Sequence, residues 1–125
     1  MNATGFSLNR KVREITTTLV FGDTTTAKMF TLPALARIIA IIPNVKTAFS
    51  GGTTELDIGV YGDGDSIADA IDISAVGQTQ PTTEIVQPGY ETTVVTDIYG
   101  NVGASNTVGE VDVTILFSHV SDSNN

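Results

Sequence analysis

Hydrophobic and polar residues alternate along several stretches of the chain with a period of two, which is typical of β-strands that have one buried face. The clearest stretch is residues 110–120. Its apolar face consists of Val111, Val113, Ile115 and Phe117, and its polar face carries Glu110, Asp112, Thr114 and Ser118. Residues 12–21 and 55–61 alternate in the same way, so all three stretches are predicted strands.

Further strands are predicted between turn signals. Residues 27–32 form a short strand after Gly22-Asp23, and residues 90–99 form a long strand after Pro88-Gly89. Residues 83–86 are predicted as a short strand, and residues 66–73 either as one helical turn or as a strand. Residues 75–81 and 100–109 are predicted loops.

The segment at residues 33–49 allows two interpretations. As a helix it would be capped by Thr31 and would carry an apolar stripe of Leu35, Ile38, Ile39 and Ile42. A strand is favoured, because the Ile residues are β-branched and Pro43 would end a helix after about ten residues. Since both faces are apolar, we expect a central strand covered on both sides, with a kink or bulge at Pro43, which lacks an N–H donor.

These strands and turns together predict an all-β chain with one domain. Composition does not change along the 125 residues, and the abundance of Thr, Val and Ile favours strands over helices. About seven or eight strands with turns between them are typical of a single-domain β-sandwich, jelly-roll-like. We expect a flexible N-terminal arm at residues 1–11, the sandwich at 12–120 and a polar C-terminal tail at 121–125.

Charge and composition exclude several classes of partner. The net charge is −8, with only six Lys and Arg residues, which argues against binding to nucleic acid or to an anionic membrane surface. The chain has no cysteine and therefore neither a disulfide nor a thiolate metal site. Edge strands of a sandwich need protection, and a symmetric oligomer is one way to cover them.

The ends and the apolar segments of the chain indicate where the protein is made. Residues 1–13 lack the basic stretch and apolar run of a signal peptide. The longest apolar run, residues 32–42, is interrupted by Pro33 and Arg37 and is shorter than the about 20 residues that span a bilayer. We expect a soluble protein made in the cytoplasm.

The chain offers little for catalysis. His119 is the only histidine, and Ser118 and Ser121 are too close to it in sequence to be oriented as its nucleophile. The Gly-x-Ser-x-Gly motif of a nucleophile elbow is absent. An exposed histidine at the end of a strand is the favoured interpretation, so we expect no catalytic residue, no cofactor and no enzyme activity.

One carboxylate cluster is present, at Asp57, Asp63, Asp65, Asp69 and Asp72. Asp63-Gly64-Asp65 resembles a fragment of a calcium loop, which makes Asp63, Asp65 and Asp69 the candidate metal ligands. The bidentate Glu that closes an EF-hand loop is absent, and so is the spacing of its third ligand. A solvated acidic turn without metal is therefore favoured over a calcium site.

A series of segments carries a resemblance to a known group of proteins. Residues 45–49 (VKTAF) are followed by Ser50-Gly51-Gly52, by residues 56–59 (LDIG) and by an Asp- and Gly-rich loop that reaches Asp69-Ala70. Together with residues 109–117 (GEVDVTILF), this order resembles small structural proteins of tailed bacteriophages, over about residues 30–75 and 105–118. Within that group the chain is most similar to the capsid decoration, or cement, proteins.

This resemblance implies a structural role. Decoration proteins are commonly jelly-roll-like homotrimers on the outside of the capsid, where they clamp neighbouring major capsid protein subunits without covalent chemistry. The resemblance thus implies a virion location after synthesis in the host cytoplasm, and an arm at residues 1–11 that orders on the capsid. The alternative is a tail fibre, baseplate or adhesin module that binds a host surface glycan, which should present exposed aromatic side chains in one groove.

Overall fold

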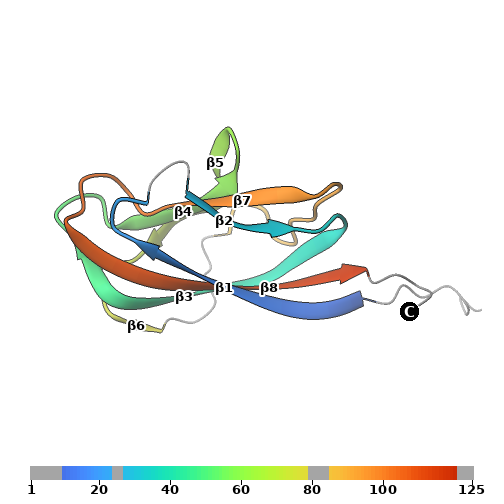
Figure 1. Ribbon diagram of the computed structural model, residues 1–125, viewed down its shortest axis with the longest axis horizontal. Coiled ribbons are helices and arrows are strands. Elements are labelled where there is room, and N and C mark those ends of the chain that lie inside the picture. The colour runs from blue at the N-terminus through green and yellow to red at the C-terminus, as the bar shows by residue number, and fades with distance from the viewer. Residues whose placement is uncertain (1–9, 24–26, 79–84, 121–125) are drawn as a thin grey trace, which may run out of the picture.

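The computed structural model describes residues 10–23, 27–78 and 85–120, which form two stacked four-stranded antiparallel sheets (Figure 1). The first sheet contains, in spatial order, β1 (Arg10–Val20), β8 (Val108–Val120), β3 (Ala36–Ser50) and β6 (Gly77–Gln78). The second sheet contains β2 (Ala27–Leu32), β7 (Thr96–Asn101), β4 (Glu55–Val60) and β5 (Asp63–Asp72). The predicted all-β sandwich is confirmed.

The strands pair in a nested order. β1 pairs with β8, β2 with β7, β3 with β6 and β4 with β5. This order arises when one long hairpin is rolled up into two sheets, which is the topology of a jelly roll, and it confirms the jelly-roll-like prediction. Because β1 and β8 are neighbours, the start and the end of the sandwich lie side by side (Figure 1).

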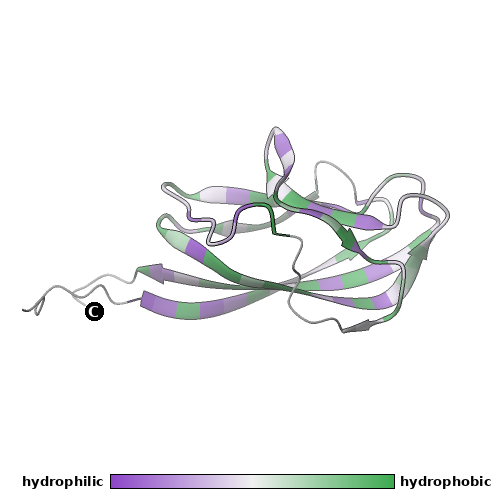
Figure 2. Ribbon diagram, turned by 180° about the vertical axis from the view of Figure 1, so that it is seen from behind, coloured by the Kyte–Doolittle hydropathy of each residue, from purple (hydrophilic) through white to green (hydrophobic). Residues whose placement is uncertain are grey.

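Every second residue of the long strands packs into the core between the two sheets. The face of β8 that was predicted to be apolar is buried at Val111, Val113, Ile115 and Phe117. Leu19 in β1 and Leu56 and Ile58 in β4 are buried opposite or beside it, and hydrophilic and hydrophobic residues alternate along the long strands (Figure 2). Among the described residues, no helix is long and apolar enough to cross a bilayer.

β3 resolves the ambiguous segment as a strand, but it is not covered on both sides as expected. Its inner face is buried at Ile38, Ile41 and Val45, whereas Ile39 on the outer side is 53% exposed. Pro43 pairs with Val113 in regular register, and the register shifts lie on either side of it. The extra residues of these bulges rotate the following side chains, which lets an almost continuous apolar run form only one buried face.

The predicted long strand at residues 90–99 is right only from Thr96 on, because the chain before it changes sheets. Ile85 forms a bridge with Ala68 of β5, and Glu91 forms one with Arg37 of β3. The strand β7 begins only at Thr96, back in the second sheet. The turn at Pro88-Gly89 permits this crossing, and a local pattern of alternation does not reveal which sheet each residue joins.

Residues 66–73, predicted as a helical turn or a strand, belong to the β4–β5 hairpin. The chain reverses at Tyr61-Gly62, and β5 passes so close to Gly59 that a Cβ atom there would overlap the carbonyl oxygen of Asp63. Only glycine tolerates so close a backbone approach. The pairing of β4 with β5 is irregular, with register shifts on both sides of Ile58, and the hairpin projects from the sandwich (Figure 1).

The remaining boundaries differ from the prediction by a few residues. β1 begins at Arg10, so the last two residues of the predicted arm belong to the sandwich. The predicted loops lose Gly77-Gln78 to β6 and both ends of 100–109 to β7 and β8. Residues 1–9 of the arm, 79–84 and the tail at 121–125 lie outside the described residues.

Candidate functional site

His119 lies near the end of β8 and is not the exposed histidine that was expected. It is half-buried, its Nε2 atom is buried, and that atom has no hydrogen-bond partner among the described residues. Its ring lies 6.0 Å from the ring of Phe117, which packs in the core. The burial could not be read from the sequence, because it depends on where the turn before β3 packs.

A groove surrounds this histidine where the two sheets separate. It encloses about 410 Å³ and is lined by Arg13, Glu14, Ile15, Pro33, Phe117 and His119. Ile15, Phe117 and Pro33 make the lining largely apolar. Arg13 is opposite Phe117 in the β1–β8 register and therefore lies on the inward side of β1. The groove thus combines a largely apolar lining with one cation, Arg13, and one carboxylate, Glu14.

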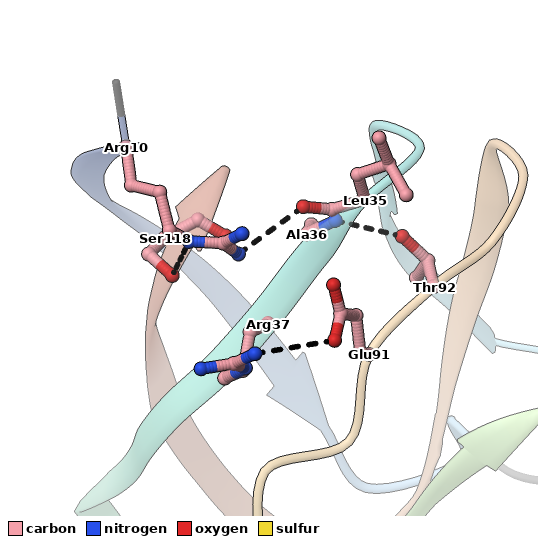
Figure 3. Close-up of polar contacts among 7 residues, drawn as sticks. All are labelled: Arg10, Leu35, Ala36, Arg37, Glu91, Thr92 and Ser118. Atoms are coloured by element: carbon pink, nitrogen blue, oxygen red, sulfur yellow. Dashed lines mark hydrogen bonds and ion pairs between the residues drawn. The ribbon is translucent and has the colours of Figure 1, made fainter. Parts of the chain in front are cut away.

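Ser118 follows Phe117 on the opposite face of β8 and is part of a separate network with Arg10 (Figure 3). Arg10 donates from Nε to Ser118 Oγ at 3.1 Å and from its terminal nitrogen to the carbonyl of Leu35 at 3.2 Å. These bonds join β1, β8 and the turn before β3. Ser118 therefore supports the fold here, and no hydroxyl among the described residues forms a hydrogen bond with His119.

A second network in the same region joins β3 to the crossing segment (Figure 3). Thr92 is buried; its hydroxyl donates to the Pro33 carbonyl at 2.7 Å and accepts from the Ala36 N–H at 2.9 Å. The Thr92 N–H donates to the Ala36 carbonyl at 2.8 Å. Arg37 and Glu91 form an exposed ion pair at 3.3 Å beside it.

Positive charge is concentrated here, at the end of the sandwich where β1 and β3 begin and β8 ends. Four of the six Lys and Arg residues lie in this region, which we call the basic end: Arg10, Lys11, Arg13 and Arg37. Lys11 and Arg13 have no ion pair with any described residue. Exposed apolar side chains lie among these cations, at Val12, Leu35 and Ile39. The sequence signal for this surface was the run of cations at residues 10–13 in an acidic chain.

Negative charge is concentrated on the β4–β5 hairpin, which we call the acidic hairpin. Residues 55–72 contain six carboxylates and no Lys or Arg. Burial raises the pKa of the Asp57 carboxyl above its ordinary value, and the neighbouring Asp69 and Asp65 add to this effect, although the Ala70 N–H, 2.8 Å from Asp57 Oδ1, opposes it. This hydrogen bond fixes Ala70, whose φ of 61° is unfavourable for a residue with a side chain. Asp57 thus has a structural role.

The three calcium candidates do not form a recognisable metal site. Asp63, Asp65 and Asp69 are exposed. Among the described residues, no group of three or more His, Cys, Asp or Glu side chains could hold a metal ion. Asp72 instead accepts hydrogen bonds from the N–H and hydroxyl of Ser74, which lower its pKa. The favoured interpretation, an acidic turn without metal, stays a prediction, and calorimetry with calcium can test it.

Two tyrosines lie together at the turn of the acidic hairpin. Tyr61 follows β4 and is 83% exposed, and its ring lies 6.1 Å from the ring of Tyr99 in β7. Neither hydroxyl forms a hydrogen bond with a described residue. Tyr61 could not be singled out from the sequence, because its exposure results from its place in the turn between β4 and β5.

Comparisons with known proteins place the fold. No protein-family model matches the chain, and no curated protein sequence matches it. A chain of the cyanophage Pam1 capsid asymmetric unit is 19% identical, with a TM-score of 0.55, over 95% of this chain and 92% of that chain. A chain of the acidic stable capsid of Helicobacter pylori bacteriophage KHP30 is 14% identical, with a TM-score of 0.57, over 90% of this chain and 95% of that chain. This chain therefore has the fold of chains found in two bacteriophage capsid structures.

Proposed function

We propose that this protein is a non-enzymatic structural component of a bacteriophage virion. The observation that carries the proposal is the similarity to chains of two phage capsids, which covers at least 90% of this chain and of each of those chains. The site supports a binding role, because the described part of the chain brings no nucleophile to its single histidine. Exposed charge and exposed apolar side chains instead meet at the basic end, as is typical of a protein interface.

Within the virion, the proposed role is decoration of the outside of the capsid. The protein would clamp neighbouring major capsid protein subunits together as a homotrimer, with residues 1–11 as an arm that orders on the capsid surface. A contact repeated over a symmetric shell gains strength by multivalency, so each single contact can be small. The acidic surface would complement basic patches on the capsid and limit non-specific self-association.

Capsids that lack this protein provide the test. Added at micromolar concentration, the purified protein should bind to such capsids and raise the temperature at which they release DNA. A variant without residues 1–9 should fold normally but bind more weakly. If wild-type protein neither binds to these capsids nor stabilises them, the decoration role is wrong.

The alternative role, a tail fibre, baseplate or adhesin module that binds a host glycan, has one observation in its favour. The exposed Tyr61 and the half-buried Tyr99 form an aromatic pair, and aromatic faces are common in carbohydrate sites. A glycan array measures this directly. Binding that Tyr61→Ala and Tyr99→Ala both abolish would support the alternative, and the absence of binding to any glycan would remove it.

A further inference from the structure

The groove beside His119 has the chemistry of a receptor for one particular kind of side chain. Its apolar lining favours an aromatic or aliphatic group. Arg13, with Lys11 close to it in β1, favours negative charge next to that group. An exposed tyrosine flanked by carboxylates meets both requirements.

The acidic hairpin presents such a tyrosine. Tyr61 is 83% exposed, and its hydroxyl has no hydrogen-bond partner in the described part of the chain. Asp63 and Asp65 follow within four residues, and both are exposed and unpaired with any described cation. Such an exposed aromatic residue is more typical of an interface anchor than of a solvated turn.

We infer that Tyr61 of one copy inserts into the groove between β1, β8 and Pro33 of a second copy, with Asp63 and Asp65 facing Arg13 and Lys11. The inserted ring packs on Ile15, Phe117 and Pro33. Glu14 also lines the groove and opposes the acidic hairpin, but its register with Leu116 places it on the outer face of β1. The cations therefore dominate the inner side of the contact.

The contact must form between copies, because Tyr61 in its own chain leans on Tyr99 of the second sheet. It joins two different surfaces, so every copy offers one groove and one hairpin. Contacts of this heterologous kind close into a ring when the rotation between copies permits it. The inference deepens the proposed function, since it gives the homotrimer its interface, but it can be tested without capsids.

The test measures self-association of the full chain by light scattering and sedimentation over a range of concentrations. Tyr61→Ala, Arg13→Glu and Asp65→Arg should each weaken self-association by at least about tenfold in Kd, as expected for an interface anchor or a charge reversal. The double variant R13E/D65R should recover most of that loss, because the reversed charges again attract. Lys46→Glu makes the same charge change outside the groove and should leave Kd unchanged.

Cross-linking gives a second measurement that does not depend on affinity. The chain has no cysteine, so a variant with Arg13→Cys and Asp65→Cys has only the introduced pair. Under oxidation it should form disulfides between copies, whereas a variant with Lys46→Cys and Asp65→Cys should not. Absence of the first cross-link, together with a wild-type Kd for the folded Tyr61→Ala and Arg13→Glu variants, would overturn the inference.

The outcomes also separate the interface from the proposed function. A monomeric wild type that binds capsids, and loses that binding through Arg13→Glu, would overturn the self-association and assign the groove to the capsid protein instead. An oligomer with the expected cross-link that does not bind capsids would support the interface and contradict decoration.

Discussion

At the basic end the long strands β1 and β8 pair in regular register, whereas the acidic hairpin depends on short and irregular pairing. β1 and β8 pair through eleven consecutive residues without a shift, and Arg10 and Thr92 join them to β3 and the crossing segment. The acidic hairpin has a close backbone contact at Gly59 and the Asp57–Ala70 hydrogen bond. The register of its two strands shifts twice. The groove at the basic end has walls of long paired strands, which hold its shape. The acidic hairpin has fewer contacts and can adapt its shape to a partner.

The largest effect is expected in the core beneath the basic end. Phe117 is buried and forms the floor of the groove, so Phe117→Ala should lower the free energy of unfolding by about 3–5 kcal/mol. The control is Phe21→Ala, since Phe21 is 47% exposed and should cost much less. Chemical denaturation measures both variants. Equal losses would show that the basic end does not rest on this core.

The next effect concerns the close backbone contact at Gly59 in the acidic hairpin. Gly59→Ala places a methyl group against the backbone of Asp63 and Gly64 and should destabilise the protein by about 1–3 kcal/mol. Gly64→Ala is the matched control, because a Cβ there meets nothing within 4 Å. A thermal melt of each variant decides the point. A Gly59→Ala protein as stable as wild type would mean that the hairpin does not depend on this close contact.

A smaller loss is expected at Thr92. Valine has nearly the same shape but leaves the Ala36 N–H without its side-chain acceptor, so Thr92→Val should cost about 1–3 kcal/mol. The control is Thr31, which forms an exposed hydrogen bond with Asp97. Thr31→Val should lower the free energy of unfolding by only a few tenths of the loss expected for Thr92→Val. Hydrogen exchange at the Ala36 and Leu35 amides should also accelerate in Thr92→Val alone.

The smallest effect is a pair of opposite pH dependences in the acidic hairpin. The pKa of Asp57 is raised in the folded state, so its contribution to stability falls as pH rises from the ordinary value of 3.8 through the raised pKa. Asp57→Asn should remove this fall, a change of less than about 1 kcal/mol because the group is near the surface.

Asp72 provides the comparison of opposite sign. Its pKa is lowered by Ser74, so its contribution is present above pH 3.8 and is lost as pH falls through the lowered value. Asp72→Asn should therefore reduce stability at neutral pH, whereas Asp57→Asn should not. Unfolding curves between pH 3 and pH 7 would contradict the assignment if both variants changed in the same direction.

The same contrast explains how much could be predicted from the sequence. Regular strands such as β8 follow from alternation, and the boundaries of β2 were predicted to the residue. The crossing at residues 85–92 was missed, because hydrogen bonds to another sheet leave no periodic signal. The groove was also missed, since the burial of His119 requires Pro33 from a distant turn, and Arg37 joins the N-terminal cations only through the pairing of β3 with β8.

The central claim is that this sandwich decorates a phage capsid, and an image of the decorated shell tests it most directly. Capsids that lack the protein, incubated with purified wild-type chain, should show by electron cryomicroscopy an added three-fold density of sandwich size on the outer surface, between major capsid protein subunits. Capsids without added density, or density on the tail, would contradict the claim.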